Sequence, residues 1–151
     1  MSAAPQTGDI PLPRPTKLSG PHWNACREGK LLVQQCGDCE TYVFIPQTQC
    51  TSCYSQNLAW VESSGRGTVY SSTTVHRPQR LEFEVPYTVA IIELEEGWHM
   101  LSNVVDCPHE EIEVGMPVEV FFREMSPEIT LPMFRRVEGA KTVPPARPGA
   151  G

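Results

Sequence analysis

The sequence predicts a mainly β protein in which a short N-terminal helix and a rubredoxin-like zinc ribbon precede a five-stranded OB-fold barrel. Two Cys-x-x-Cys pairs separated by ten residues predict the ribbon, and five β-type runs between turn residues after residue 64 predict the barrel. Fifteen prolines and eleven glycines among 151 residues leave little room for long helices. We expect an arm at 1–18, a helix at 19–30, the ribbon at 31–63, the barrel at 64–138 and a disordered tail at 139–151.

The N-terminal segment combines the arm and the helix. Four prolines and little periodicity in residues 1–18 predict an extended, mostly unfolded arm. Pro21 suits the first turn of the helix that follows, and Gly29 is a typical residue just beyond a helix end. Trp23 and Cys26 lie three residues apart and share one face. We expect Cys26 to be a small buried apolar residue, because no catalytic base is identifiable nearby in the sequence.

The two cysteine pairs are Cys36 with Cys39 and Cys50 with Cys53. They can place four thiolate sulfurs at the corners of a tetrahedron, which Zn²⁺ prefers. Two disulfides or a thioredoxin-like redox pair are the alternatives. Residues 1–20 lack a signal-peptide pattern, which favours a reducing cytoplasm over disulfides, and no βαβ pattern supports a redox pair. The spacing therefore predicts one structural zinc ion per chain in a closed site that catalyses nothing.

The ribbon is expected to contain three strands at 31–35, 42–46 and 58–62. Phe44 and Trp60 are expected to pack against the metal site as its small core. The segment is too small to fold by burial alone, so we expect the metal to supply most of its stability.

Five barrel strands are predicted at 67–76, 86–94, 97–105, 118–122 and 131–137. The second run alternates, with one side formed by Val89, Ile91 and Glu93 and the other by Thr88, Ala90, Ile92 and Leu94. A loop-helix insert at 107–115 separates the third and fourth strands. This order fits a small OB-fold barrel, and a small β-sandwich is the alternative.

Composition limits the function classes. The net charge of −6 disfavours a general nucleic-acid binder, because phosphate contacts need clustered Lys and Arg. Single-stranded nucleic-acid binding is still the main alternative function, since ribbons and OB-folds both serve it. No apolar run approaches the ~20 residues of a membrane helix. The other cysteines, Cys26 and Cys107, and the four histidines form no recognisable catalytic motif, so no catalytic residue is predicted. A hydrolase or transferase using either cysteine is a further rival.

Several short stretches follow one another in a distinctive order. They are PLPRPT (11–16), the Trp23, Cys26 and Gly29 pattern, L-x2-Q-x-C-x2-C (32–39), the second Cys pair, SGRGTVYSSTTVHR (64–77), PYTVAIIEL (86–94), GWHMLSN (97–103), IEVGMPVEVFF (112–122) and LPMFR (131–135). In these stretches the chain resembles the bacterial and archaeal family of zinc-ribbon, OB-fold proteins associated with acyl-CoA metabolism. It departs from the family pattern at Glu40, where a glycine usually follows the first Cys pair, and we expect metal ligation to survive this.

The resemblance implies an accessory subunit. Family members look like partners of thiolase-fold enzymes, whose own chain carries the catalytic Cys and His residues. We therefore expect a non-catalytic, cytoplasmic subunit of a hetero-oligomer that scaffolds a thiolase-fold chain and helps to bind acyl-CoA. The overall reaction would be carbon–carbon bond cleavage, either thiolytic, as in an acyltransferase, or retro-aldol, as in a lyase.

Four basic residues are candidates for the CoA contact: Arg66, His76, Arg77 and Arg80. Arg66 is expected in a turn entering the barrel, and the other three open the loop between the first two barrel strands. OB-folds bind ligands with such loops, and cations there could neutralise the phosphates of CoA. The alternative is that these residues form exposed ion pairs with Glu82 and Glu84, which stabilise a protein by only ~0–1 kcal/mol.

Overall fold

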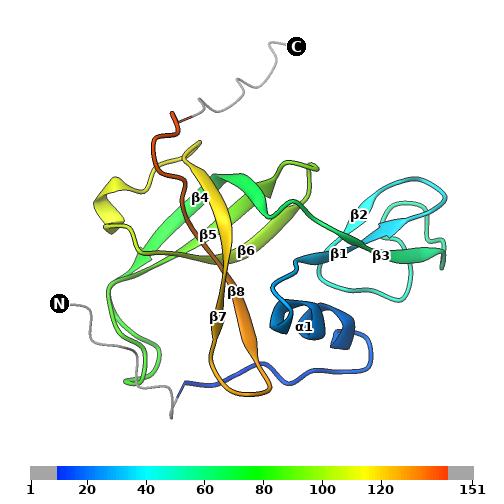
Figure 1. Ribbon diagram of the computed structural model, residues 1–151, viewed down its shortest axis with the longest axis horizontal. Helices are drawn as coiled ribbons and strands as arrows, with labels where there is room; N and C mark the ends of the chain where they lie inside the picture. Colours follow the sequence, from blue (N-terminus) through cyan, green and yellow to red (C-terminus); the bar gives the residue numbers. More distant parts are fainter. Residues whose placement is uncertain (1–9, 143–151) are drawn as a thin grey trace.

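The computed structural model describes residues 10–142, in which a short helix, a three-stranded ribbon and a five-stranded barrel follow one another (Figure 1). The predicted arm up to residue 9 and the predicted tail from residue 143 lie outside the described residues. The elements are α1 (Gly20–Arg27), β1 (Leu32–Cys36), β2 (Tyr42–Val43), β3 (Leu58–Glu62), β4 (Arg66–Val75), β5 (Tyr87–Leu94), β6 (His99–Val105), the 3-10 turn η1 (His109–Glu111), β7 (Pro117–Glu124) and β8 (Thr130–Arg136).

Helix α1 lies within the predicted range 19–30 and is shorter, spanning Gly20–Arg27. Pro21 lies in its first turn, where the missing N–H needs no partner. Gly29 adopts φ +77° just beyond the helix, and its N–H bonds to the carbonyl of Cys26 at 3.1 Å. The helix buries His22, Ala25 and Cys26 and contacts β1, β7 and β8. Within the described residues, no helix is long and apolar enough to cross a membrane.

The ribbon is an antiparallel sheet with strand order β2-β1-β3. Gln34 lies at its centre and faces Val43 on one side and Trp60 on the other. The metal-side cluster consists of Cys36, Val43 and Cys50, with Leu58 packed against it. The prediction that Phe44 and Trp60 form this small core was therefore wrong.

Phe44 turns toward the barrel instead. Its ring centroid lies 5.2 Å from that of Trp98 and 5.6 Å from that of His22. Val33 of β1 and Leu31, just before this strand, are also buried in the barrel cluster. One side of the ribbon thus holds the metal and the other side extends the barrel core, so the two parts share apolar contacts.

The barrel closes in the order β4-β5-β6-β8-β7, with β7 returning to β4. Strands β6 and β8 run parallel, through Val104 opposite Phe134, and all other neighbouring pairs are antiparallel. A closed five-stranded barrel confirms the predicted OB-fold class over the alternative sandwich.

The interior of the barrel follows the predicted alternation. Thr88, Ala90, Ile92 and Leu94 of β5 are all buried, so of the two alternating sides predicted for this strand, this one faces the core. Phe134 on β8 is completely buried and is among the largest side chains of this core. The insert before β7 contains η1, as the loop-helix prediction required.

Candidate metal centre and ligand-binding end of the barrel

The four cysteines of the two pairs converge at the end of the ribbon. Their sulfur atoms all lie within 4.8 Å of one another. Cys36 and Cys50 are buried, whereas Cys39 and Cys53 are exposed. The Cys36 and Cys53 sulfurs lie 3.6 Å apart, and the Cys39 and Cys50 sulfurs lie 3.5 Å apart.

Each cysteine pair forms a tight turn of the same design. The N–H of Asp38 donates to the Cys36 sulfur, and the N–H of Ser52 donates to the Cys50 sulfur, both at 3.4 Å. Such contacts stabilise thiolate charge. The residue after each pair, Glu40 or Tyr54, adopts a left-handed backbone with φ near +60°. The two turns thus present their sulfurs to one shared point.

This geometry fits a zinc ion bound by four thiolates. A disulfide needs sulfurs about 2.05 Å apart, so the observed separations are too long for one. Zn–S bonds of about 2.3 Å in a tetrahedron place the sulfurs about 3.8 Å apart, close to the observed values. The donors therefore fit one structural zinc ion per chain. Four protein ligands fill its coordination sphere, so the zinc would hold the turns together and offer no position for a substrate.

Cys26 lies in a buried contact that the sequence analysis missed. Its sulfur is 3.8 Å from Nε2 of His22, one helical turn earlier. The i, i+4 spacing was visible in the sequence and could have indicated this pair. Burial raises the pKa of the Cys26 thiol to about 12 and lowers the pKa of His22. Because Cys26 is 1% exposed and its thiol stays protonated, the pair is a packing contact and not a nucleophile with its base.

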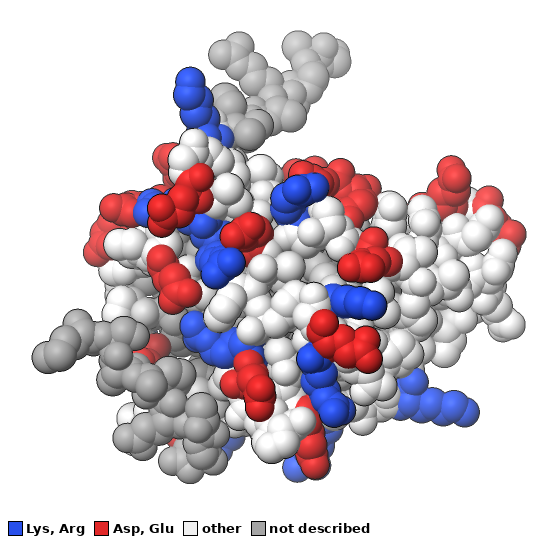
Figure 2. Space-filling view, viewed as in Figure 1, with Lys and Arg blue, Asp and Glu red and all other residues white. Residues whose placement is uncertain are grey.

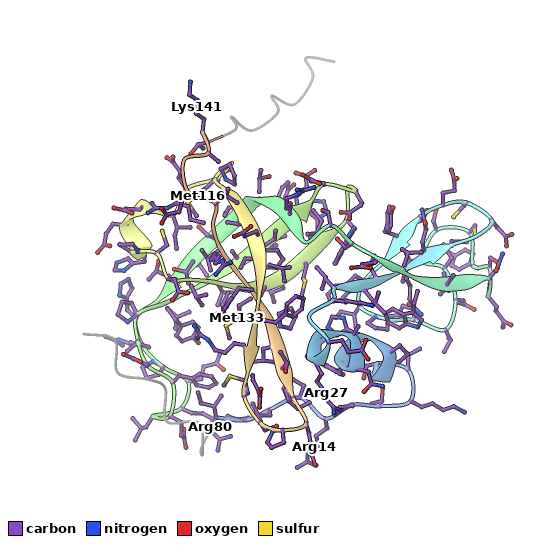
Figure 3. The ribbon with its side chains drawn as sticks, in the orientation of Figure 1. Arg14, Arg27, Arg80, Met116, Met133 and Lys141 are labelled. Carbon is purple, nitrogen blue, oxygen red and sulfur yellow. The ribbon has the colours of Figure 1, made fainter. Side chains whose placement is uncertain are left out.

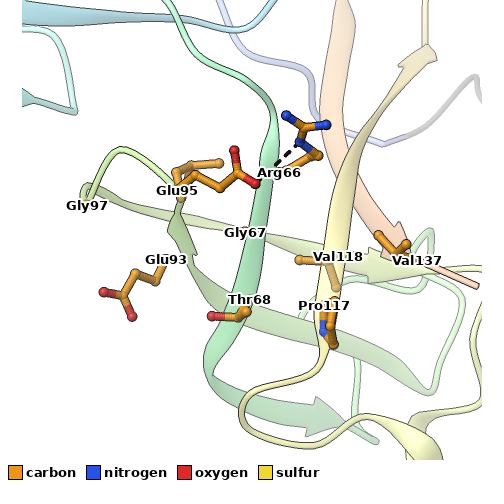
Figure 4. A pocket seen from close by; sticks show the side chains of 10 residues that line it. Arg66, Gly67, Thr68, Glu93, Glu95, Gly97, Pro117, Val118 and Val137 are labelled. Atoms are coloured by element: carbon orange, nitrogen blue, oxygen red, sulfur yellow. Dashed lines mark ion pairs between the residues drawn. The ribbon is translucent and has the colours of Figure 1, made fainter. Parts of the chain in front are cut away.

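Arg66 lies at the start of β4 (Figure 4). Its Nε is 3.4 Å from a carboxylate oxygen of Glu95, and both side chains are exposed. Gly67, Pro117 and Val137 line the same hollow, whose volume is about 450 Å³. Arg66 thus faces a shallow surface beside the β5–β6 turn.

The other three basic candidates lie beyond the opposite end of β4. His76, Arg77 and Arg80 are exposed in the β4–β5 loop, and Figure 3 shows Arg80 far from Lys141 and Met116 at the other end of the barrel. Ten residues of extended strand separate Arg66 from His76, a span of about 30 Å. The structure therefore brings His76, Arg77 and Arg80 into one loop and leaves Arg66 apart.

Some of the side-chain contacts of the β4–β5 loop match those that the sequence predicted. Arg80 forms an ion pair with the half-buried Glu82 at 3.7 Å, one of the two partners that the alternative interpretation expected. The His76 ring meets the edge of His109 with centroids 5.6 Å apart, which links the loop to η1. Cys107 lies in a bend beside this loop, and His109 opens the 3-10 turn η1 that follows it.

A groove next to this loop was not predicted. It has a volume of about 560 Å³ and lies between the β4–β5 loop, the η1 turn and the β7–β8 hairpin. Its apolar wall includes Phe83, Tyr87, Leu131 and Met133, and Arg123 adds a cation. These residues come from segments far apart in the sequence, so no local pattern could indicate the groove. OB-folds bind ligands at this end of the barrel.

Surface charge is mixed over the side seen in Figure 2, where Lys and Arg alternate with Asp and Glu. Two ion pairs join neighbouring elements: Arg135 with Glu119 on the adjacent strand at 3.1 Å and Arg136 with Glu111 of η1 at 2.7 Å. A broad positive surface of the kind that tracks a phosphate backbone is absent from this view.

Two family models match adjacent stretches of the chain. The model "ChsH2, rubredoxin-like zinc ribbon domain" covers residues 23–59, and "ChsH2, C-terminal OB-fold domain" covers residues 60–123. A "DUF35 domain-containing scaffold protein" of Methanocaldococcus jannaschii is 36% identical over 106 residues, which are 68% of this chain and 75% of the relative. The chain belongs to this ChsH2/DUF35 family. The resemblance seen in the sequence is thereby confirmed.

Other relatives are longer, or are solved structures. A "probable enoyl-CoA hydratase alpha subunit" of Thermomonospora curvata is 40% identical over 113 residues, 75% of this chain, and the match spans 35% of that relative. The solved "Ltp2-ChsH2(DUF35) aldolase" contains a chain that is 37% identical with a TM-score of 0.76, covering 83% of this chain and 98% of that one. A DUF35 protein from Sulfolobus solfataricus, 13% identical over 80% of this chain and 86% of its own, shares the fold with a TM-score of 0.58.

Proposed function

We propose that this chain is a non-catalytic accessory subunit of a thiolase-like complex that cleaves a carbon–carbon bond in an acyl-CoA thioester. In this role it scaffolds a thiolase-fold catalytic chain and helps to bind the CoA ester. The observation that carries the proposal is the match over 98% of a chain in the Ltp2-ChsH2(DUF35) aldolase. The archaeal relatives named as scaffold proteins support the same role.

The side chains of this chain also support a non-catalytic role. The four ribbon thiolates would be occupied by zinc. The Cys26 thiol is buried, and burial raises the pKa of the Cys107 thiol as well. Neither of these two thiols is a good nucleophile at neutral pH, since the thiolate is the reactive form. Carbon–carbon bond chemistry would therefore take place on the partner chain.

The β4–β5 loop and the groove beside it are the proposed CoA contact. Arg77 and Arg80 would meet phosphate groups, and the apolar groove wall would accept the uncharged part of the ester. His76 would hold the loop against η1 through His109. Arg66 lies at the other end of β4, so any contact that it makes with CoA would be a separate one.

A second candidate partner is a hydratase chain. Two relatives are named as alpha subunits of hydratases that act on CoA esters, one from Thermomonospora curvata and one from Mycobacterium tuberculosis, the latter 38% identical over 65 residues. This chain spans 35% and 21% of those relatives. A hydratase partner would keep the accessory role and change the reaction.

Co-expression tests the proposal. We would co-express the tagged chain with each thiolase-fold chain, and each hydratase chain, of its own genome, and analyse complexes by size-exclusion chromatography with light scattering. We expect a stable complex with a thiolase-fold chain and thioester cleavage by the complex. A complex with a hydratase chain alone would favour the second candidate.

Three further measurements sharpen this test. A variant carrying Cys26→Ser and Cys107→Ser should retain the activity of the complex, because neither thiol takes part in the reaction. Turnover of a thioester by the isolated chain would contradict the accessory role. Binding of single-stranded DNA or RNA at near-physiological salt, weakening as salt rises, would favour the nucleic-acid alternative.

A further inference from the structure

The outer face of β4, β5 and β6 departs from the usual pattern of an antiparallel barrel. A sheet with one side on a core normally presents polar residues on its other side. Ala90 and Ile92 of β5 point into the core, so Val89 and Ile91 point outward. Two β-branched apolar residues thus occupy outward positions in the central strand of the three.

Neighbouring strands extend this apolar surface. Ile91 lies directly opposite Leu101 of β6 and opposite Ser71 of β4. Leu101 is 66% exposed, and Tyr70, at the bulge of β4, is 56% exposed. We define the outer apolar face as Tyr70, Val89, Ile91 and Leu101.

Tyr70 is held in place by an aromatic neighbour. Its ring meets the ring of His99 on β6, with centroids 4.8 Å apart and planes at 67°. This edge contact restricts the Tyr70 side chain before any partner arrives. A large, pre-positioned aromatic group costs little conformational entropy on binding, which is why tyrosine is frequent in protein interfaces.

Charge is scarce on these three strands. Among the residues of β4, β5 and β6, Arg66 and Glu93 are the charged side chains, apart from His99. Arg66 pairs with Glu95, whereas the exposed Glu93 has no ion pair with any described residue. The side shown in Figure 2 carries many alternating charges by comparison. An apolar, aromatic centre depleted of charge is the composition of a protein interface, and its lack of Lys and Arg disfavours nucleic acid.

We infer that the outer apolar face is the docking surface for the catalytic chain of the proposed complex. The partner would present an apolar surface to Leu101 and Tyr70, with a Lys or Arg side chain positioned against the carboxylate of Glu93. This inference rests on the proposed function and adds the surface through which it is carried out. It places the partner next to the groove, because Tyr87 continues the same side of β5 into the groove wall.

The test compares two equally exposed apolar residues. Leu101→Arg changes the outer apolar face, and Ile45→Arg changes the ribbon, where Ile45 is 69% exposed. Each full-length variant is mixed with the thiolase-fold chain that binds the wild type, and the dissociation constant is measured by calorimetry. We expect Leu101→Arg to weaken binding at least ~30-fold, the effect of a central interface residue, and Ile45→Arg to change it less than ~3-fold.

Two further measurements test the inference even if the Leu101→Arg variant does not fold. Tyr70→Ala should also weaken binding, and hydroxyl-radical footprinting of the wild-type complex should show Tyr70 and Leu101 protected. Wild-type affinity in Leu101→Arg and Tyr70→Ala, or no protection of either residue, would overturn the inference while the proposed function stands. A larger loss from Ile45→Arg would move the interface to the ribbon and also overturn it.

Two other outcomes concern the occupant of this face. If the wild type binds no thiolase-fold chain, the proposed function fails, and the inference that rests on it fails as well. If the wild-type chain alone is a dimer that Leu101→Arg dissociates, the face binds a second copy of this chain and the inference is wrong.

Glu93→Lys should weaken the complex and make its affinity rise with salt, because like charges would then meet at the edge of the interface.

Discussion

The ribbon and the barrel hold their strands together in different ways. The metal-side cluster of the ribbon has three buried residues, two of them cysteines, whereas the barrel cluster has twelve. So small a cluster cannot offset the conformational entropy that is lost when the ribbon becomes ordered. Zinc binding by the four cysteines supplies the stability that burial does not. Metal binding thus stabilises one part of the chain, and apolar burial stabilises the adjacent part. We therefore expect removal of the metal to unfold the ribbon, and truncation of a core side chain to destabilise the barrel.

The largest effect is expected from removal of the metal. Structural zinc sites contribute on the order of 10 kcal/mol, comparable to the stability of a whole domain. We expect Cys50→Ser, or treatment with a strong chelator, to unfold the ribbon. Because Leu31 and Val33 belong to the barrel cluster, the melting temperature of the barrel should fall as well. Bound zinc measured by mass spectrometry and amide dispersion in NMR spectra would report both changes.

Cys107→Ser is the control for this experiment, because Cys107 lies outside the metal cluster. It should keep one zinc per chain and a folded ribbon. A ribbon whose amide signals stay dispersed after the metal has been removed would contradict the comparison.

The next largest effect is expected in the barrel core. Phe134 is fully buried on β8, and Phe134→Ala should lower the free energy of unfolding by about 3–5 kcal/mol through lost burial and the cavity left behind. The zinc content should be unchanged, which distinguishes this variant from the cysteine variant. Leu81→Ala is the control, since Leu81 is 96% exposed and its loss should cost less than about 0.5 kcal/mol. Urea unfolding followed by circular dichroism gives both values.

These two regions also differ in what their sequence reveals. Zinc ligation could be predicted from local spacing, because a tetrahedral ion needs two closely spaced pairs and little else. The two alternating sides of β5 could be predicted because alternation is also local, whereas the side that faces the core is set by the barrel. The core that buries the Phe44 side chain could not be predicted. Phe44 follows β2 in the ribbon, but its ring lies against Trp98 of the barrel. Apolar character indicates that a side chain is buried, not which core receives it.

The candidate ligand site shows the same limit. His76, Arg77 and Arg80 are neighbours in sequence and share a loop in the structure. Arg66 was grouped with them by charge, but a ten-residue strand carries it to the other end of the barrel. The groove is built from five separate segments, so its existence depends on the barrel topology and not on any one motif. Local patterns predict elements, and sites formed between elements need the fold.

A smaller effect is expected from a buried histidine of helix α1. His22 packs against Phe44 of the ribbon, and burial lowers its pKa below the usual 6.5. The unfolded chain therefore binds a proton at pH values where the folded chain does not. This contribution to stability is complete above pH 6.5 and is lost as the pH falls below it.

His22→Gln should therefore reduce the dependence of the melting temperature on pH between pH 7 and pH 5. Both proteins lose zinc-thiolate stability in acid, so the difference between their pH profiles isolates His22. Parallel profiles would show that His22 is protonated equally well in the folded and unfolded chains.

The smallest effect is expected within the ribbon turns, where the fold tolerates an unfavourable backbone. Glu40 adopts φ +63°, a left-handed conformation that costs a residue with a Cβ about 1 kcal/mol and costs glycine almost nothing. Glu40→Gly should therefore raise the free energy of unfolding by up to about 1 kcal/mol, partly offset by the greater entropy of glycine in the unfolded chain. Glu40→Ala is the matched control, because it removes the carboxylate and keeps the Cβ. Equal stability of the two variants would show that charge, and not backbone strain, is what Glu40 contributes at this turn. A gain confined to the glycine variant, with one zinc still bound, would show that the metal holds a turn which the local sequence disfavours.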